Sequence, residues 1–586
     1  MEIMSLRPVV LPIMFSVQSN GHHCRLNQPH HPLNNDMQAQ NARLNDVDVL
    51  ISGYGPTGAT LANLMGQRGY RVLVIDQESA IYDKPRAITA DQEVLRILQE
   101  FGVADEVAAA STPHPGTDYV GLQGQVIKRF YPAPPPNALG WEPSWMFVQP
   151  DLEAVLRKAV DRQPNVRSLL AHRLIGFEQD QNTVTAQIQR LSDGEPLTVR
   201  ARYAIAADGA SSIVRKQLAA PVEDLAFDEW WLVVDAWISG PIDLPERCVQ
   251  YCRPARPGTY IVGPGTLRRW EIKLLPHEDP SDYRDNHEAV WRILGEFVDT
   301  RSLTHCRTAV YRFHALVVHE WRHGRVFLAG DAAHQMPPFL GQGLCAGIRD
   351  ASNLAWKLDA VMRGLSGDHL LDSYTVERKK HVRTVVGHAK SFGLIIGELD
   401  VNKARERDRI LEQDLRLGRA ETIRQRFIPG LESGLMAHKP NGELQAGAGE
   451  LFIQPWVRLR QGDWQLLDDL TGPRFVIAIS SRDTLSALDP DSQAIIQAID
   501  GRCVLVQAGT DSGHEAQDAH NTPIFEERDG LLAQWLAAHH AVAVIARPDK
   551  YVYGIAQNAH DLRQLLLELL AALIEPTVHG DRNEQG

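Results

Sequence analysis

A glycine-rich loop between two apolar runs constrains the fold of this chain more than any other feature of its sequence. Residues 47–78 read VDVLISGYGPTGATLANLMGQRGYRVLVIDQE. The run at 47–51 predicts a buried strand, residues 53–58 fit the pattern GxGxxG, and the apolar spacing that follows predicts a helix. A second apolar run, at 71–75, ends at Asp76. This order predicts a βαβ unit, which opens an α/β domain with a parallel sheet.

The three glycines of this loop each have a physical task in a dinucleotide site. Gly53 allows a tight turn, Gly55 lets the backbone approach a pyrophosphate, and Gly58 permits close packing of the helix against the strand. The start of the helix presents free N–H groups to the phosphates, and Asp76 can accept hydrogen bonds from a ribose. The pattern therefore predicts binding of NAD or FAD; the alternative is a glycine turn without a ligand.

A second pattern of strand, loop and helix occupies residues 325–358, which read RVFLAGDAAHQMPPFLGQGLCAGIRDASNLAWKL. Asp331 ends the apolar strand, where its carboxylate can meet a sugar or ribityl hydroxyl. Residues 341–344 open a helix whose backbone N–H groups can stabilise the negative charge that a flavin ring acquires on reduction. Pro337 and Pro338 stiffen the loop before that helix. This second pattern favours FAD over NAD, and its alternative is an ordinary turn with a surface aspartate.

A third motif lies between these two patterns. Residues 207–215 read ADGASSIVR, with Asp208 at another strand end and Arg215 in the helix that follows. In this order, the three motifs resemble those of the group A flavoprotein aromatic monooxygenases, the para-hydroxybenzoate hydroxylase family, over roughly residues 47–390. Further segments are most similar to the 3-(3-hydroxyphenyl)propionate hydroxylases of that family: KPRAITADQEVLRILQEFGV, FVQPDLEAVL, GIRDASNLAWKL, LFIQPWV, LLDDLTG and ARPDKYV.

The resemblance implies which residues bind FAD. Its ADP part would contact the glycine loop and the second strand end, while Arg86 and Gln149 would lie against the cofactor. Asp208 would lie near the pyrophosphate and help with the nicotinamide donor, and Asp331 would lie near the ribityl or ribose hydroxyls. Pro337 and the backbone amides of residues 341–344 would lie beside the flavin ring. The implied cofactor-binding residues are Gly53, Tyr54, Gly55, Pro56, Thr57, Gly58, Asp76, Gln77, Arg86, Gln149, Asp208, Gly330, Asp331, Pro337, Gly341, Gln342, Gly343 and Leu344.

The resemblance also implies a reaction, the ortho-hydroxylation of a phenolic acid in aromatic catabolism. The expected substrate is 3-(3-hydroxyphenyl)propionate, with FAD as cofactor, NADH or NADPH as electron donor and O2 as cosubstrate. Another phenol, a resorcinol or a polycyclic aromatic substrate stays open, because a fold does not fix a substrate. Two different functions also stay open: an FAD dehydrogenase or oxidase without oxygen insertion, and a non-catalytic carrier or interaction protein that has the FAD-binding fold.

The residues that contact the substrate are less well defined. An inserted strand-rich domain is expected to cover the flavin ring and exclude water from the pocket. No residue is assigned to deprotonate the phenol. His334 is expected to support its loop, and Cys345, where many family members have Asn, puts a side-chain hydrogen bond to the flavin in doubt. Candidates for the pocket lining, although aromatics in strands are usually core, are Trp230, Trp231, Tyr251, Tyr260 and Trp270. Candidates for binding the substrate carboxylate, each alternatively a surface charge, are Arg253, Arg256, Arg268 and Arg269.

The length of 586 residues is too great for one hydrophobic core, so several domains are expected. The expected fold class is α/β: a Rossmann-like FAD-binding domain, an inserted strand-rich substrate domain, and a C-terminal thioredoxin-like domain that lacks redox cysteines. A disordered N-terminal extension is expected at 1–45, and the FAD-binding domain at 46–221 and 311–395, with some substrate-domain segments within 112–200. The substrate-binding sheet is expected at 222–310. A helical linker at 396–450 and the thioredoxin-like domain at 451–575 are expected to follow.

Charge and cysteine content limit the partners of the chain. A formal net charge of −13 gives no overall positive field to attract nucleic acid. No apolar run is long enough to span a membrane, and the N-terminus is a poor signal peptide. The six cysteines form no CxxC pair, so no metal site is expected and a reducing cytoplasm fits best. A small aromatic acid is the expected partner, and a homodimer is a possible assembly.

Overall fold

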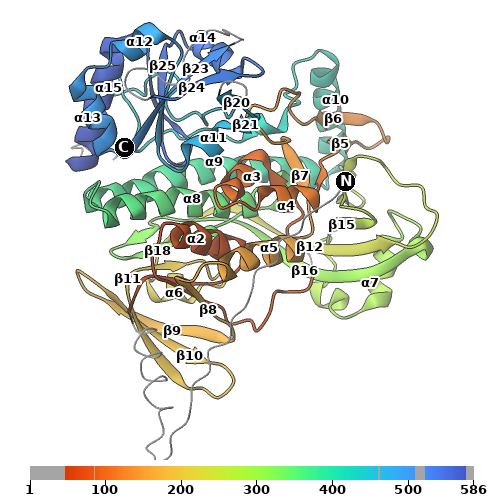
Figure 1. Cartoon of the computed structure of the whole chain (residues 1–586). Helices are drawn as coiled ribbons and strands as arrows, with labels where there is room; N and C mark the ends of the chain where they lie inside the picture. Colours follow the sequence, from red (N-terminus) through yellow and green to blue (C-terminus); the bar gives the residue numbers. More distant parts are fainter. Residues whose placement is uncertain (1–45, 85, 460–461, 509–521, 576–586) are drawn as a thin grey trace, which may run out of the picture. The chain divides into compact units, whose positions relative to one another are not determined.

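The structure is a computed structural model that describes residues 46–84, 86–459, 462–508 and 522–575. The extension expected at 1–45 lies outside the described residues. The chain has a mixed α/β fold, and Figure 1 labels its helices and strands. None of the helices within the described ranges combines the length and the apolar character needed to cross a membrane.

The first sheet has the parallel order that the βαβ pattern predicts. Its central strands run β18-β11-β1-β2-β8 and are parallel, while β17, β10 and β9 are antiparallel additions. Because parallel strands end at the same edge of a sheet, their carboxyl ends bring distant loops together. The strands are β1 (Asp46–Ser52), β2 (Val72–Ile75), β8 (Val166–Leu169), β9 (His172–Gln179), β10 (Val184–Arg190), β11 (Pro196–Ala206), β17 (Arg322–His323) and β18 (Val326–Leu328).

Helices cover this first sheet, and a small sheet of three strands lies in the same part of the chain. The helix α2 (Pro56–Gln67) follows the glycine loop and packs on α8 (Gly343–Met362), which follows the second loop. Further helices in this part of the chain are α3 (Gln92–Gln99), α4 (Ala104–Ala109), α5 (Gln149–Asp161), α6 (Ile213–Gln217) and α9 (Ser373–Ile396), whereas α10 (Val401–Arg416) packs on β6 (Val126–Phe130) of the second sheet. The small sheet contains β3 (Thr89–Asp91), β4 (Thr112–Pro113) and β7 (Ser144–Met146).

The second large sheet is mostly antiparallel and has the order β19-β16-β12-β15-β14-β13-β5-β6. Its two long strands, β12 and β16, lie side by side in Figure 1 and pair along most of their length. The helix α7 (His287–Leu294) covers one face through a shared apolar core. The strands are β5 (Thr117–Val120), β6 (Val126–Phe130), β12 (Val222–Ile238), β13 (Cys248–Tyr251), β14 (Gly258–Val262), β15 (Leu267–Lys273), β16 (Leu303–Val318) and β19 (His334–Gln335).

The C-terminal part forms a third sheet, of order β21-β20-β24-β23-β22-β25-β26. The strands β22, β23 and β24 are parallel, whereas β25 and β26 are antiparallel. The description of this part as thioredoxin-like stays a prediction. Its elements are β20 (Trp456–Leu459), β21 (Gln465–Leu466), α11 (Leu467–Thr471), β22 (Phe475–Ile479), α12 (Arg482–Ser486), α13 (Pro490–Ala498), β23 (Gly501–Ala508), β24 (Ile524–Glu527), α14 (Leu531–Ala538), β25 (Ala543–Ala546), β26 (Val552–Ala556) and α15 (Ala559–Ile574).

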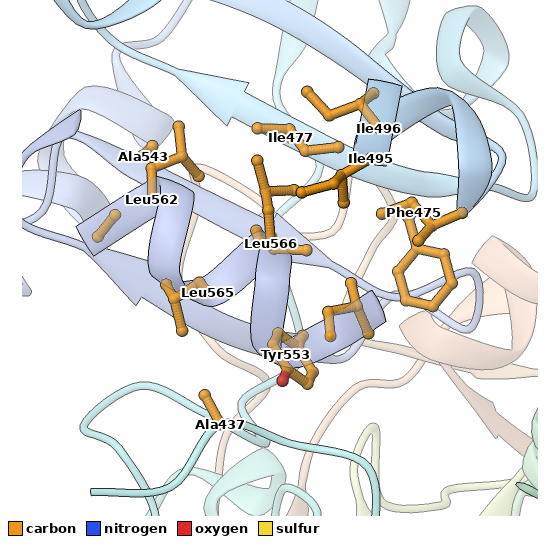
Figure 2. Packing of buried hydrophobic residues seen from close by; sticks show 14 of the residues in the cluster. Ala437, Phe475, Ile477, Ile495, Ile496, Ala543, Tyr553, Leu562, Leu565 and Leu566 are labelled. Atoms are coloured by element: carbon orange, nitrogen blue, oxygen red, sulfur yellow. The ribbon is translucent and has the colours of Figure 1, made fainter. Parts of the chain in front are cut away.

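The last helix, α15, shows how the sequence builds this core. Leu562, Leu565 and Leu566 follow helical spacing and are buried, whereas the neighbouring Leu567 is exposed. Figure 2 shows the buried leucines beside Ile477 and other side chains of the sheet and of α13. Each buried leucine of this kind contributes about 1.5–3 kcal/mol.

Two expected boundaries differ from the elements. The linker expected at 396–450 is helical in α10 but, apart from a short 3-10 turn at Arg424–Phe427, is irregular beyond residue 416. Its prolines and glycines explain this, since neither residue type favours a helix interior. The boundary expected at 310 falls within β16, which stays paired with β12 as far as Val318. We therefore propose that the strand-rich domain continues to residue 318.

Candidate cofactor and substrate site

A cavity of about 770 Å³ lies where the carboxyl edge of the first sheet meets the second sheet. This volume is toward the upper end of the range for ligand pockets. Most of the cofactor-binding residues expected from the sequence line it: Gly53, Gly55, Pro56, Thr57, Asp76, Gln77, Arg86, Gln149, Asp208, Asp331, Gly341, Gly343 and Leu344. The structure therefore brings the three separated motifs to one cavity.

The glycine loop is shaped by close approaches that a side chain would prevent. Gly53 has φ +104°, and a Cβ added there would lie 2.2 Å from the Ala207 carbonyl oxygen. A Cβ on Gly58 would lie 2.0 Å from the carbonyl oxygen of Gly53. Above Gly55, by contrast, there is open space, with no atom within 4 Å of an added Cβ. This space faces the start of α2, where a pyrophosphate would be stabilised by backbone N–H groups.

Asp76 fixes this loop from the end of β2. Its Oδ2 atom accepts a hydrogen bond from the Tyr54 backbone N–H (2.7 Å), and its Oδ1 atom accepts one from the Glu78 N–H (2.9 Å). The Tyr54 side chain does not reach the cavity. It is buried, and the Arg157 guanidinium lies 4.4 Å from its ring centre. Tyr54 therefore contributes to the loop through its backbone.

The end of β11 offers an acceptor without a partner. Asp208 accepts a hydrogen bond from the Ile213 N–H at Oδ2 (2.9 Å), while its buried Oδ1 atom has no hydrogen-bond partner in the described part of the chain. Burial raises the pKa of Asp208, because its ionised form is poorly solvated there. A hydrogen bond donated by a ligand to the free Oδ1 atom would offset this cost. Arg215 then connects two motifs, because its Nη1 atom donates to the Ala332 carbonyl (2.9 Å) in the loop that contains Asp331.

Asp331 faces the cavity at the end of the third strand. Desolvation by the surrounding protein raises the pKa of its carboxyl group, whereas the charges of His334, Arg86 and Arg215 lower it. The neighbouring Gly330 does not line the cavity, because it packs against Thr57: an added Cβ would lie 2.8 Å from the Thr57 Oγ1 atom. A ligand hydroxyl group can therefore reach the Asp331 carboxylate.

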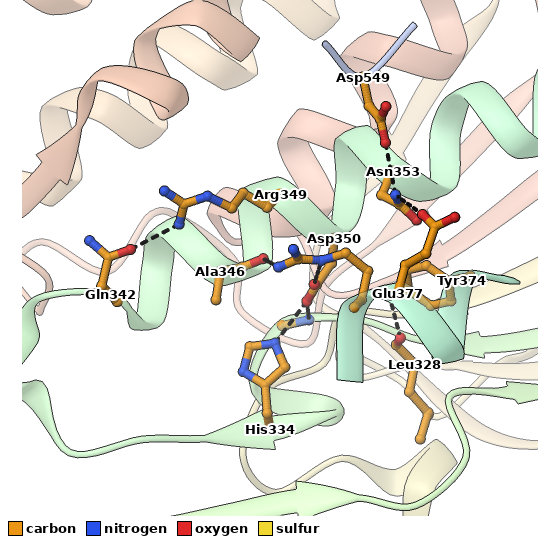
Figure 3. A network of polar contacts seen from close by, with 12 residues as sticks. Leu328, His334, Gln342, Ala346, Arg349, Asp350, Asn353, Tyr374, Glu377 and Asp549 are labelled. Atoms are coloured by element: carbon orange, nitrogen blue, oxygen red, sulfur yellow. Dashed lines mark hydrogen bonds and ion pairs between the residues drawn. The ribbon is translucent and has the colours of Figure 1, made fainter. Parts of the chain in front are cut away.

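A buried ion cluster holds the loop around Asp331. His334 Nε2 lies 2.8 Å from Asp350 Oδ2, which also accepts the Gly330 N–H (3.0 Å), and Arg378 Nε donates to Asp350 Oδ1 (2.9 Å). Figure 3 shows His334 and Asp350 facing each other across this loop. Burial opposes the charge on Asp350, but His334 and Arg378 lower its pKa. His334 does not line the cavity, in keeping with the supporting role expected for it.

The loop before α8 presents its backbone rather than its side chains. Gln342 points away from the cavity and accepts a hydrogen bond from Arg349 Nη1 (2.9 Å), as Figure 3 shows. The Cys345 thiol is fully buried under the loop, so it is not a contact of the cavity. Pro338 lines the cavity, whereas the expected Pro337 does not.

Sequence reasoning missed a row of residues on α5. Glu153 and Arg157 line the cavity together with the expected Gln149. These three positions are four residues apart and share one helix face, a signal that was present in the sequence. Gln149 Nε2 donates to Glu153 Oε1 (2.6 Å), and the Ala87 N–H donates to Gln149 Oε1 (2.5 Å). Gln149 thereby holds the segment next to Arg86 against the cavity.

The pocket-lining alternative for the five aromatic candidates is wrong, and the other alternative, that aromatics in strands belong to the core, holds. None of the five candidates, Trp230, Trp231, Tyr251, Tyr260 and Trp270, lines the cavity. The reason is strand alternation, because successive side chains point to opposite faces of a sheet. Tyr260 and Trp270 belong to the core beneath α7, while Trp231 is covered by Phe313 and Phe339, with ring centres 5.9 and 5.0 Å away.

Other residues of the second sheet form this wall of the cavity. They are Val233, Ile261, Arg269, Glu271, Arg307, Tyr311, Arg312, Phe313 and His314. Of the four candidate arginines, only Arg269 lines the cavity. Arg256 pairs with Glu278 (2.6 Å), and Arg253 stacks against Phe297 on the other face of the sheet.

Charged side chains are buried in this wall. Asp235 pairs with Arg269 (2.7 Å) and with Arg307 (3.4 Å), and Arg269 lies 3.9 Å from Glu271. Burial raises the pKa of Glu271 to about 7; Asp235 acts in the same direction, whereas Arg269 and Arg307 oppose it. The wall therefore combines apolar surface with a carboxyl group that can exchange a proton near neutral pH and with arginines that can stabilise a negative charge.

Comparisons with known proteins agree with this geometry. A family model described as the FAD binding domain matches residues 46–389, and one described as the HcaD C-terminal domain matches residues 449–572. A 3-(3-hydroxy-phenyl)propionate/3-hydroxycinnamic acid hydroxylase of Mycobacterium sp. (strain JLS) is 33% identical over 90% of this chain and 92% of its own length. A probable NADH-specific resorcinol 4-hydroxylase of Rhodococcus jostii (strain RHA1) is 33% identical over 90% of this chain and 95% of its own length.

Solved structures share the fold. The flavin-dependent monooxygenase PieE, in complex with FAD and substrate, superposes with a TM-score of 0.72 at 23% identity, over 90% of this chain and 99% of that chain. Aklavinone-11 hydroxylase, in a ternary complex with FAD and aklavinone, gives a TM-score of 0.71 at 22% identity, and the match covers 90% of this chain and 98% of that chain.

The parallel sheet, its three acidic strand ends and the shared cavity define a flavoprotein of the α/β class. The chain belongs to the FAD binding domain family, whose model matches more than half of its length. It is an FAD-dependent monooxygenase.

Proposed function

We propose that this monooxygenase hydroxylates a phenolic acid ortho to its hydroxyl group, with 3-(3-hydroxyphenyl)propionate as substrate and 2,3-dihydroxyphenylpropionate as product. The observation that carries the proposal is the cavity, which joins the three dinucleotide motifs to a partly apolar wall of the second sheet. Relatives of 33% identity over about nine-tenths of the chain are named for hydroxylation of this substrate, which supports the same choice.

The residues around the cavity fit FAD. We assign the pyrophosphate to the open space above Gly55 and the start of α2, with Asp76 at the ribose of the ADP part. The unpartnered Oδ1 atom of Asp208 and the exposed carboxylate of Asp331 supply acceptors for hydroxyl groups. When bound, FAD supplies electron transfer from NADH, the donor in the name of the resorcinol relative, and activation of O2.

The flavin ring is assigned to the region between the 341–344 loop and the second sheet. The loop offers Gly343 and Leu344 at the N-terminus of α8, where backbone N–H groups favour negative charge. Val233, Ile261 and Phe313 of the second sheet add apolar surface to the same cavity. This apolar wall limits the water that reaches the reacting ring.

The cavity also supplies local positive charge for an anionic substrate. The whole chain is acidic, so it cannot attract a carboxylate by its overall field. Arg86, Arg269 and Arg307 line the cavity and give it that attraction locally. This distribution supports an aromatic acid over an uncharged phenol.

The test is a panel of hydroxyphenyl acids with matched uncharged phenols. We expect NADH oxidation to accelerate with 3-(3-hydroxyphenyl)propionate and to be coupled to a dihydroxylated product. Equal or better coupling with an uncharged phenol or a resorcinol would remove the propionate assignment. Turnover without O2 consumption would support a dehydrogenase, and purified protein without flavin would support a non-catalytic role.

We further propose that the enzyme acts in the cytoplasm on a small aromatic acid and assembles as a homodimer. The buried thiols of Cys248, Cys252 and Cys345 are compatible with a reducing compartment. Size-exclusion chromatography with light scattering tests the assembly, since a single species of the monomer mass of 65.3 kDa would contradict the dimer.

A further inference from the structure

One carboxylate in the substrate wall, Glu271, is not among the residues that we assign to FAD. Glu271 lies in the middle of β15, opposite Val233 of β12 and Thr259 of β14. It lines the cavity, although only 4% of the residue is exposed. Its neighbours along the strand, Trp270 and Ile272, point to the core beneath α7. The alternation of β15 therefore directs Glu271 toward the cavity.

The Glu271 carboxylate is available for a ligand. No hydrogen bond from any described residue reaches its side chain, and its nearest ion-pair contact, to Arg269 Nη1, is 3.9 Å long. A separation of that length is too great for a hydrogen bond. Asp235, in contrast, is held by Arg269 and Arg307 in the same cluster. A nearly buried carboxylate without such bonds is costly unless a ligand or a proton satisfies it.

The charged groups that face Glu271 favour a proton acceptor. Arg269 lies on its own strand, Asp235 on β12, and Arg307 and Tyr311 on β16, whereas β14 contributes Thr259 and Ile261, which do not titrate. Two arginines thus face one other carboxylate, so an added negative charge at this wall is stabilised. Burial brings the pKa of Glu271 to about 7, where a carboxylate can act as a base at neutral pH.

We propose that Glu271 accepts the proton of the substrate's phenolic hydroxyl group; this assignment rests on the proposed function. The phenol O–H bond breaks, its proton moves to a Glu271 carboxylate oxygen, and the electron pair stays on the phenol oxygen. That oxygen then donates electron density to the ortho carbon, where the new oxygen is added. Arg269 and Arg307 stabilise the negative charge that remains in the cavity.

Other candidates for this role are placed less well. His334 is buried against Asp350 and does not line the cavity. His314 lies 3.8 Å from Asp228, an exposed residue that also pairs with Arg312. Tyr311 is hydrogen-bonded to Arg307. His314→Gln and Tyr311→Phe therefore accompany the main variant in the test.

The test uses the FAD-loaded enzyme and compares Glu271→Gln with wild type across pH values on both sides of neutrality. We expect wild-type kcat/KM to rise with pH through about 7. Glu271→Gln should lose this rise and fall about 100-fold in kcat at neutral pH, with FAD content retained and substrate Kd changed only severalfold. Glu271→Asp should regain part of the rate together with the pH dependence. Glu288→Gln, an exposed carboxylate on α7, is the matched control and should behave as wild type.

A spectroscopic measurement separates base chemistry from a structural effect. The ultraviolet difference spectrum of a bound phenolic acid should show phenolate appearing as pH rises through about 7 in wild type, but not in Glu271→Gln. Retention of the pH-dependent rise in Glu271→Gln, or its transfer to His314→Gln or Tyr311→Phe, overturns the proposal. If Glu271→Gln does not fold, a wild-type complex in which the phenol stays neutral through this range overturns it equally. Absence of any dihydroxylated product from wild type contradicts the proposed function instead.

Discussion

At the scale of single residues, hydrogen bonding and burial distinguish the carboxylates around the cavity. Asp76 accepts two backbone N–H groups, Asp208 accepts one and leaves an oxygen without a partner, and Glu271 accepts none from the described residues. Because each missing donor makes the ionised form less stable in a buried position, the pKa of Asp208 and that of Glu271 are raised. The same functional group, a carboxylate, therefore serves to fix a loop, to hold a ligand and to exchange a proton.

The first prediction concerns Gly53→Ala. The new Cβ would lie 2.2 Å from the Ala207 carbonyl and would also strain the positive φ, so both the loop and β11 must shift. We expect protein with little bound FAD and a lower melting temperature, measured by absorbance and thermal unfolding. Gly69→Ala is the control: φ is also positive there, but no atom lies within 4 Å, so it should cost only about 1 kcal/mol and keep its flavin. Equal flavin content in both variants would contradict the placement of the loop.

The second prediction concerns Asp331→Ala. Loss of a carboxylate that accepts hydrogen bonds from FAD should weaken cofactor binding by about 1–3 kcal/mol, a factor of roughly 5 to 150 in Kd. Titration of apoprotein with FAD, followed by flavin fluorescence, measures this change. Asp372→Ala, an exposed aspartate near the start of α9, is the control and should bind FAD as wild type does. An unchanged Kd for Asp331→Ala would show that this strand end does not contact the cofactor.

The third prediction links Glu271 to stability. Its pKa is about 7 in the folded protein against 4.5 for an ordinary glutamate, so the folded state holds the proton more tightly. The free energy of unfolding therefore decreases as pH rises from 4.5 to about 7, by up to about 3 kcal/mol. Glu271→Gln removes this loss. It should be more stable than wild type at alkaline pH and similar to it near pH 4.5, as measured by urea unfolding. A stability difference that does not vary with pH would contradict the raised pKa.

At the scale of elements, the cofactor loops were predictable and the substrate wall was not. Gly53, Asp76 and Asp331 could be found because each follows an apolar strand, and parallel strands end at one edge. The substrate wall depends on which face of β12 is buried. Residues 230–237 read WWLVVDAW, in which both faces of the strand are largely apolar. The alternation of side chains along the strand therefore could not show which face lines the cavity.

The neighbouring strand did contain a usable signal. Residues 267–273 read LRRWEIK, in which the charged Arg269, Glu271 and Lys273 alternate with Trp270 and Ile272. This alternation identifies a polar face, but only the fold shows that the face lines a cavity rather than meeting solvent. The hydrogen bond from Arg269 to the Arg86 carbonyl likewise joins positions far apart in the sequence.

The fourth prediction concerns the contact between the Asp331 loop and α8. Asp350→Asn removes the charge that His334 and Arg378 share and leaves Arg378 without its buried partner. Breaking a buried ion pair from one side costs about 3–5 kcal/mol, so we expect a clear decrease in the urea midpoint and easier loss of FAD. Asp372→Asn, an exposed residue that pairs with Arg322, should change stability by less than about 1 kcal/mol. Similar midpoints for the two variants would mean that the cluster does not hold the loop.

At the scale of the whole molecule, the C-terminal sheet is connected to the cofactor helices by buried charges. Arg547, next to β25, bonds Glu377 of α9 (2.7 Å) and Asp549 (2.6 Å), and Asn353 of α8 donates to Asp549 (2.8 Å). Figure 3 shows Asn353 between Glu377 and Asp549. A second connection runs from Tyr551, which donates to Glu93 (2.8 Å), through Arg349 to Gln342 in the loop before α8. The C-terminal part therefore supports the loop that we assign to the flavin ring.

The fifth prediction tests this support with Arg547→Met, which keeps an unbranched apolar stem and removes the guanidinium charge. Glu377 would lose one of its two buried cations and keep only Lys357, so we expect a loss of about 3–5 kcal/mol. Because the network joins two parts of the chain, FAD release and unfolding of the C-terminal part should shift together to lower urea. Flavin fluorescence follows FAD release, and limited proteolysis between β20 and α15 follows unfolding of the C-terminal part. Arg563→Met removes an exposed arginine of α15 and should leave both unchanged. If FAD release in Arg547→Met occurs at the wild-type urea concentration while the C-terminal part unfolds earlier, the two parts are not coupled through this network.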